Sequence, residues 1–171
     1  MSKAPASKID IKRVGSSLGL NFAGPISEET TFPTIPDDST ITEIKLNLGK
    51  LTLVNSWGVR LWMKWLWDLD VRFATAQITL EQCPPAMVKQ ILVVERFVPE
   101  RTRVSSILLP YYCEACDKDQ VSQLRADDLI LKKTPDRVAK ALGTKDCPLC
   151  GGVMDIDIMP DRFLGIFNLK K

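Results

Sequence analysis

Histidine is absent from this sequence of 171 residues. Its absence removes the most common general base, the histidine-activated serine and cysteine nucleophiles, and every metal site that needs an imidazole ligand. An enzyme built on this chain would have to work with carboxylates, lysine or cysteine alone. We therefore expect a protein that is not an enzyme.

Long apolar runs are also absent. The sequence has no uninterrupted apolar stretch of about 18 residues, the length that a membrane-spanning helix needs. Residues 1–8 lack the apolar centre of a signal peptide. These features favour a cytoplasmic location without a membrane span.

An excess of one charge sign is lacking as well. The 23 basic and 21 acidic residues give a formal net charge of +2. Broad binding to nucleic-acid phosphates is driven by basic charge, so this balance makes a nucleic-acid partner a weak expectation. The hydrophobic share of 45% and the charged share of 26% are typical of a globular chain with a real core.

Four of the five cysteines form two C-x-x-C pairs, Cys113 with Cys116 and Cys147 with Cys150. Two such knuckles can supply the four thiolates of a tetrahedral zinc site, and the glycines after Cys150 suit the tight turn of the second knuckle. Four protein ligands leave no position for a reactive water. The prediction is one structural zinc per chain, with iron as the alternative because spacing does not distinguish tetrathiolate metals.

Disulfides and a redox dithiol fit this pattern less well. Disulfides are rare in the cytoplasm, and a redox dithiol normally uses one C-x-x-C pair. Cys83 stands alone before Pro84 and Pro85. We interpret it as a small residue in a strand-to-helix turn, with a reactive thiol at a helix start as the alternative.

Periodicity predicts an α/β fold. Alternating or continuous apolar residues indicate strands, and apolar residues three and four apart indicate helices. The expected strands are residues 9–14, 18–22, 44–48, 73–80 and 105–109, and the expected helices are residues 56–70 and 85–94. Asn55 or Ser56 is expected to cap the first helix.

A change in composition divides the chain. Residues 1–110 carry the α/β pattern, whereas residues 111–160 are rich in charge and contain both knuckles. We expect an α/β domain over 1–110, a zinc ribbon over 111–160 with a short helix at 134–143, and a segment over 161–171 that returns to the main domain. The ribbon has few large apolar residues, so the metal should hold it together.

Two segments of the α/β part resemble STAS domains. Residues 20–30, LNFAGPISEET, are similar to the opening pattern L-x-G-x-L-x-x-x-T of that family. Residues 46–59, LNLGKLTLVNSWGV, are similar to its hallmark D-L-S-x-V-x-x-I-D-S-S-G. The resemblance spans about residues 9–110 and implies a mixed sheet covered by helices. It also implies a function similar to that of bacterial anti-sigma factor antagonists, which bind a kinase and are released by serine phosphorylation.

This sequence differs from the family pattern at the positions that surround the phosphorylated serine. Asn55 replaces the family aspartate, Ser56 matches the first serine, and Trp57 replaces the serine that is usually phosphorylated. The ordinary phosphoserine switch is therefore not expected. Ser56 stays a candidate phosphorylation site, although a role in capping the helix explains it more simply.

The four tryptophans are concentrated in the first helix. The helical spacing places Trp62 and Trp65 on the apolar face, where core packing explains them. Trp57 and Trp67 project on the polar side, and exposed tryptophans beside charges are typical of interface anchors. We predict a partner-binding surface there, unless the zinc ribbon folds over it. Its residues are Trp57, Arg60, Lys64 and Trp67.

The sequence therefore predicts a non-catalytic, STAS-like regulatory or scaffolding module that binds another protein, of a kinase-like or sigma-regulatory kind. The sequence leaves open whether the protein forms a homodimer. The first alternative is a zinc ribbon that binds nucleic acid through Lys132, Lys133 and Arg137, although a zinc held by four thiolates would cancel the positive net charge. The second alternative is a partner-switch protein phosphorylated on Ser56.

Overall fold

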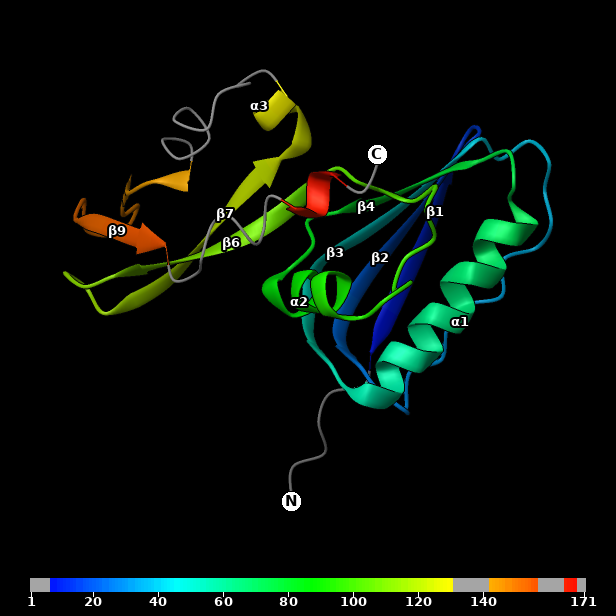
Figure 1. The fold of residues 1–171 in the computed structure, drawn as a ribbon, viewed down its shortest axis with the longest axis horizontal. Coiled ribbons are helices and arrows are strands. Elements are labelled where there is room, and N and C mark those ends of the chain that lie inside the picture. The colour runs from blue at the N-terminus through cyan, green and yellow to red at the C-terminus, as the bar shows by residue number, and fades with distance from the viewer. Residues whose placement is uncertain (1–6, 131–141, 157–164, 169–171) are drawn as a thin grey trace.

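A computed structural model describes residues 7–130, 142–156 and 165–168 of the chain. Within these ranges the chain forms a five-stranded sheet with two helices beside it and a separate four-stranded sheet (Figure 1). The α/β class predicted from periodicity is confirmed. None of the helices described is long and apolar enough to cross a membrane.

The first sheet is mixed. Its strands are β1 (Lys8–Val14), β2 (Ser17–Ile26), β3 (Glu43–Val54), β4 (Gln77–Glu81) and β5 (Arg103–Val104), and they lie in chain order. β1 runs antiparallel to β2, and each later pair is parallel. The parallel pairs need crossovers. The β3–β4 crossover contains α1 (Ser56–Arg72), and the β4–β5 crossover contains α2 (Pro85–Val93).

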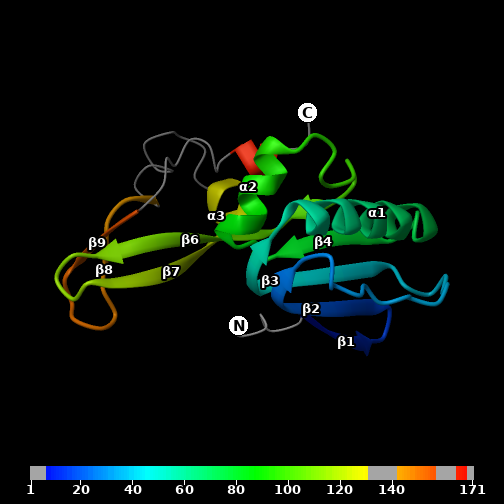
Figure 2. The ribbon, with the colours of Figure 1, turned by 90° about the horizontal axis from the view of Figure 1, so that it is seen from below.

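Both helices lie on one face of this sheet (Figure 2). Side chains alternate along β3, so Ile44, Leu46 and Leu48 are buried beneath the helices whereas Glu43 and Lys45 point to the other face. The second face is polar and only half-buried. The helices thus cover one face of the mixed sheet.

The core beneath α1 is aromatic. Trp62, Leu66 and Leu69, spaced four and three residues apart, are fully buried or nearly so. Trp62 packs edge-on against Phe22 with ring centroids 5.8 Å apart and stacks on Phe97 at 6.1 Å. The prediction of a core role for Trp62 is confirmed.

The second sheet carries the cysteines. Its strands are β6 (Ser106–Cys113), β7 (Lys118–Arg125), β8 (Lys145–Asp146) and β9 (Val153–Ile156), in the antiparallel order β7-β6-β9-β8. A short helix, α3 (Ala126–Ile130), follows β7. The 3-10 helix η1 (Gly165–Asn168) packs against α2 and β5, with Ile166 buried.

Strand β6 joins the two sheets, so the expected boundary at residue 110 falls inside a strand. The Cys83 N–H donates to the Ser106 carbonyl at 3.0 Å, and the Leu108 N–H donates to the Cys83 carbonyl at 2.8 Å. These bonds pair the start of β6 with the chain just after β4. The far end of the same strand is Cys113, the first of the paired cysteines.

Local expectations differ from the structure at several places. Residues 44–48 and the apolar stretch after them form one strand, β3, that reaches Val54. The strand expected from Phe73 begins only at Gln77, because α1 extends to Arg72 and the Phe73 N–H donates to Leu69 to close the helix. The helix expected over residues 134–143 falls almost wholly outside the described residues.

Candidate metal centre and partner surface

The four paired cysteines lie together at one end of the second sheet. The sulfur atoms of Cys113, Cys116, Cys147 and Cys150 all fall within 4.8 Å of one another. Cys113 and Cys150 are 3.5 Å apart at sulfur, and Cys116 and Cys147 are 3.8 Å apart. A tetrahedron with metal–sulfur bonds of 2.3 Å has edges of roughly 3.8 Å. The cluster therefore has the size of a tetrathiolate metal site. Its sulfur–sulfur distances are far longer than a disulfide bond.

Strand pairing brings the two knuckles together. Cys113 is the last residue of β6, and it pairs with Met154 of β9. Cys116 lies in the turn to β7, whereas the second knuckle connects β8 to β9. Residues more than 30 positions apart thus meet because their strands are neighbours in one sheet.

Two glycines make the second knuckle tight. Gly151 has a φ of +73°, a left-handed conformation that favours glycine. A Cβ on Gly152 would lie 2.8 Å from the Ala115 Cβ and 3.3 Å from the Cys150 sulfur. The Gly152 N–H also donates to that sulfur at 3.4 Å. The first knuckle packs directly on the second, as expected for one shared site.

The thiols are electrostatically unequal. Burial is the largest single effect on the pKa of Cys147 and raises it, but hydrogen bonds from the Leu149 and Cys150 N–H groups and from the Cys113 and Cys150 thiols together outweigh it, and the pKa falls to about 7. Burial and neighbouring thiols raise the pKa of Cys116 to about 12. Thiolates bind metal, so a cation near the four sulfurs would favour loss of the remaining protons. The donor set fits zinc or iron, and it supplies four ligands with no open position.

The predicted partner surface begins at the first turn of α1. The Asn55 side chain accepts a hydrogen bond from the Gly58 N–H at 2.8 Å and caps the helix. Trp57 is 59% exposed, and the Arg60 guanidinium lies over its ring at 5.4 Å from the centroid. Lys64 is exposed one turn further on. Three of the predicted surface residues therefore share one stripe of α1.

Trp67 lies in a different environment. Its indole N–H donates to the Arg96 carbonyl at 3.0 Å, and the side chain is half-buried. Trp67 lines a cavity with the segment after α2, including Val98 and Pro99. Among the residues that the structure describes, that segment packs beside this tryptophan, and the second sheet does not.

Ser56 is exposed at the first position of α1. The cap is supplied by Asn55, so the explanation of Ser56 as the capping residue is wrong. The reactive-thiol alternative for Cys83 does not fit either. Cys83 is fully buried between β4 and α2, and burial raises the pKa of its thiol strongly. The basic residues of the nucleic-acid alternative, Lys132, Lys133 and Arg137, lie outside the described residues.

A polar cavity at the junction of the sheets was not predicted. Glu81 is the last residue of β4 and Gln82 follows it, whereas Arg125 and Asp127 come from the end of β7 and the start of α3. The sequence signal nearest to this place is the turn before Pro84, which predicts a change of chain direction and no cavity. Residues from segments more than 40 positions apart meet here through the pairing of β6 with the chain after β4.

The chain matches no protein-family model, and a search of curated proteins finds no relative.

Proposed function

We propose that this chain is a non-catalytic regulatory or scaffolding module that binds another protein through the exposed stripe of α1. One observation carries the proposal. Trp57 exposes more than half of its side chain on the first turn of a helix whose other tryptophans are buried or half-buried. Large exposed aromatic side chains are costly in water and are enriched at the centres of interfaces.

The charge around Trp57 indicates what kind of partner fits. Arg60 and Lys64 lie on the same stripe, and neither has an ion pair within the described part of the chain. A partner with an apolar pocket and acidic groups beside it would complement them. The resemblance to STAS domains also supports the N-terminal end of α1 as the binding surface, because members of that family bind their kinase at the corresponding helix end. An indole at this position favours a partner other than one shaped for a phosphorylatable serine.

We further propose zinc as the metal of the cysteine cluster. Zinc in a closed tetrathiolate site stabilises small folds that have little core of their own. The second sheet suits that role because β8 and β9 have only two and four residues. The metal would fix the ribbon without taking part in chemistry.

The interface is tested by capturing partners from the native lysate with the wild-type protein and the variant Trp57→Ala. Truncation of a central interface tryptophan typically weakens binding by about 30- to 1000-fold. The variant should melt as the wild type does, because the side chain makes few contacts in the free protein. Val71→Ala, which truncates another exposed residue of α1, should retain the partner.

Two results would contradict the proposal. Trp57→Ala could keep its partner at full affinity, which would place the interface elsewhere. It could also melt far lower than the wild type, which would assign the indole to the fold.

A second candidate function is a phosphorylation switch at Ser56. The observation that favours it is an exposed hydroxyl at the first position of α1. A phosphate there would lie at the positive end of the helix dipole and beside Arg60. Intact mass spectrometry of protein from its native cell tests this, since a stoichiometric phosphate mapped to Ser56 supports the switch and its absence rejects it.

A further inference from the structure

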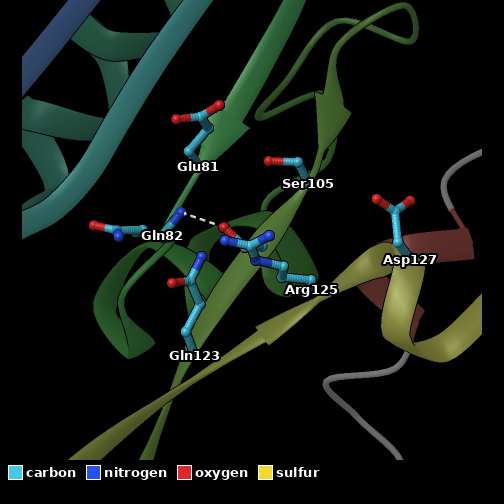
Figure 3. A pocket seen from close by; sticks show the side chains of 7 residues that line it. Glu81, Gln82, Ser105, Gln123, Arg125 and Asp127 are labelled. Carbon is cyan, nitrogen blue, oxygen red and sulfur yellow. Dashed lines mark hydrogen bonds between the residues drawn. The ribbon is translucent and has the colours of Figure 1, made fainter.

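A cavity of about 290 Å³ lies where the first sheet meets the second. Its walls come from the end of β4, from the adjoining ends of β6 and β7, and from α3 (Figure 3). The volume falls at the lower limit of small-molecule pockets, which span about 300–1000 Å³. The cavity also adjoins the carboxyl end of a parallel strand, the side on which α/β sheets generally bind ligands.

The lining is polar and carries charges of both signs. Glu81 and Asp127 contribute carboxylates and Arg125 contributes a guanidinium, as Figure 3 shows, with Ser105 and Gln123 beside them. No ion pair or side-chain hydrogen bond satisfies any of the three charged groups among the described residues. Arg125 and Asp127 are exposed and Glu81 is half-buried, so all three charges face solvent and are accessible to a ligand.

One residue at this cavity, Gln82, has an energetically unfavourable backbone conformation. Gln82 has a φ of +52°, a region that only a few per cent of residues other than glycine adopt. Its N–H donates to the Ser106 hydroxyl at 2.8 Å, which ties it to β6 (Figure 3). Its side chain lies on Gly49, where a Cβ would come within 2.4 Å of the Gln82 Oε1. Strained residues held by their surroundings are concentrated at functional sites.

We infer that this cavity binds a small zwitterion of the α-amino-acid class. Arg125 recognises the carboxylate, because a guanidinium pairs with carboxylates through two parallel hydrogen bonds. Glu81 and Asp127 recognise the ammonium group, and the amides and hydroxyls accept or donate to a polar side chain. A simple anion would meet two carboxylates, and a simple cation would meet the guanidinium. Only a ligand with both charges complements the whole lining.

The experiment measures binding of glycine and of each of the nineteen standard L-α-amino acids to the full chain, first by thermal shift and then by calorimetry. At least one amino acid should raise Tm saturably. Its carboxamide derivative, which lacks the carboxylate, and its N-acetyl derivative, which lacks the ammonium, should both bind far more weakly. Trp57→Ala should bind it normally, so the result is independent of the proposed interface.

Two variants assign the ends of the ligand. Arg125→Gln and Glu81→Gln should each weaken binding by about 10- to 100-fold, the loss expected for a charge-assisted hydrogen bond. Lys12→Gln, which removes a positive charge from exposed β1 far from the cavity, should bind as the wild type does. Unchanged melting of each unliganded variant shows that the fold is intact.

Three results would overturn the inference. They are the absence of binding by any amino acid, equal binding of the carboxamide derivative, and binding that survives Arg125→Gln unchanged.

Discussion

Gly58 lies directly against the backbone of Ile26. A Cβ at position 58 would fall 2.1 Å from the Ile26 carbonyl oxygen and 2.6 Å from its carbonyl carbon. The first turn of α1 thus packs on the end of β2 with no room for a side chain. The Ile26 carbonyl also accepts a hydrogen bond from the Asn55 N–H at 3.1 Å, so it cannot easily move away.

Gly58→Ala should therefore destabilise the protein by about 3 kcal/mol, the upper end of the usual range for overpacking. Urea unfolding followed by circular dichroism measures this loss. The matched control is Gly19→Ala, where the new Cβ would meet the Lys12 carbonyl at an ordinary 3.5 Å. Equal stability of the two variants would contradict the close approach.

Truncating Asn55 should lower the free energy of unfolding far more than truncating Ser56. Asn55 caps α1 and also donates to the Glu28 carboxylate at 2.7 Å. Asn55→Ala should lose about 1 kcal/mol of unfolding free energy, the usual value of an N-cap. Ser56→Ala should change it by less than about 0.5 kcal/mol, as exposed substitutions generally do. The reverse order in urea unfolding would make Ser56 the cap.

Asp38 should titrate at unusually low pH. Hydrogen bonds from Thr40 and then from the Arg13 guanidinium lower its pKa from 3.8 to about 2. Because the folded pKa lies below the unfolded one, the stabilising contribution is complete above pH 3.8 and is lost as the pH falls through about 2.

Carboxyl NMR titration of the wild type and Thr40→Val tests this assignment. The wild-type midpoint should lie near 2, and the variant midpoint should move up toward 3.8. An unchanged midpoint in Thr40→Val would show that the Thr40 hydroxyl does not hold the carboxylate.

The sequence was most informative where local pattern and structure coincide. Alternation along β3, the helical spacing of Trp62 and Leu66, and the C-x-x-C pairs are all short-range signals. The structure confirms these features because each of them is determined by residues that are close together in the sequence. To predict the cysteine cluster, the two C-x-x-C pairs had to be placed together in space although they are distant in the sequence. That inference was possible because two such pairs supply the four thiolates that one tetrahedral metal site needs.

Features set by distant segments were not visible in the sequence. Trp57 and Trp67 were predicted to be alike because they lie on the polar side of one helix. Only the path of the chain after α2 places a carbonyl, that of Arg96, beside the indole of Trp67. The polar cavity was missed for the same reason, since it depends on β6 pairing with the chain beside Cys83.

Gly152→Ala should weaken the metal site without removing a ligand. The new Cβ would press on Ala115 and on the Cys150 sulfur, which would force the two knuckles apart. We expect faster loss of metal to a chelator, measured by the colour of the chelator complex. Val153→Ala, at an exposed neighbouring position, should lose metal at the wild-type rate. Equal rates for both variants would show that the packing of the knuckles does not matter.

The four paired cysteines are expected to act as one metal centre. Elemental analysis of the purified chain should find one zinc per molecule, retained in Cys83→Ser and lost in Cys113→Ser. The α/β part should stay folded in Cys113→Ser, because its core lies under α1 and α2. A wild-type chain without metal, or zinc that survives Cys113→Ser at full occupancy, would contradict the account. A red, iron-containing protein would keep the site and reject zinc.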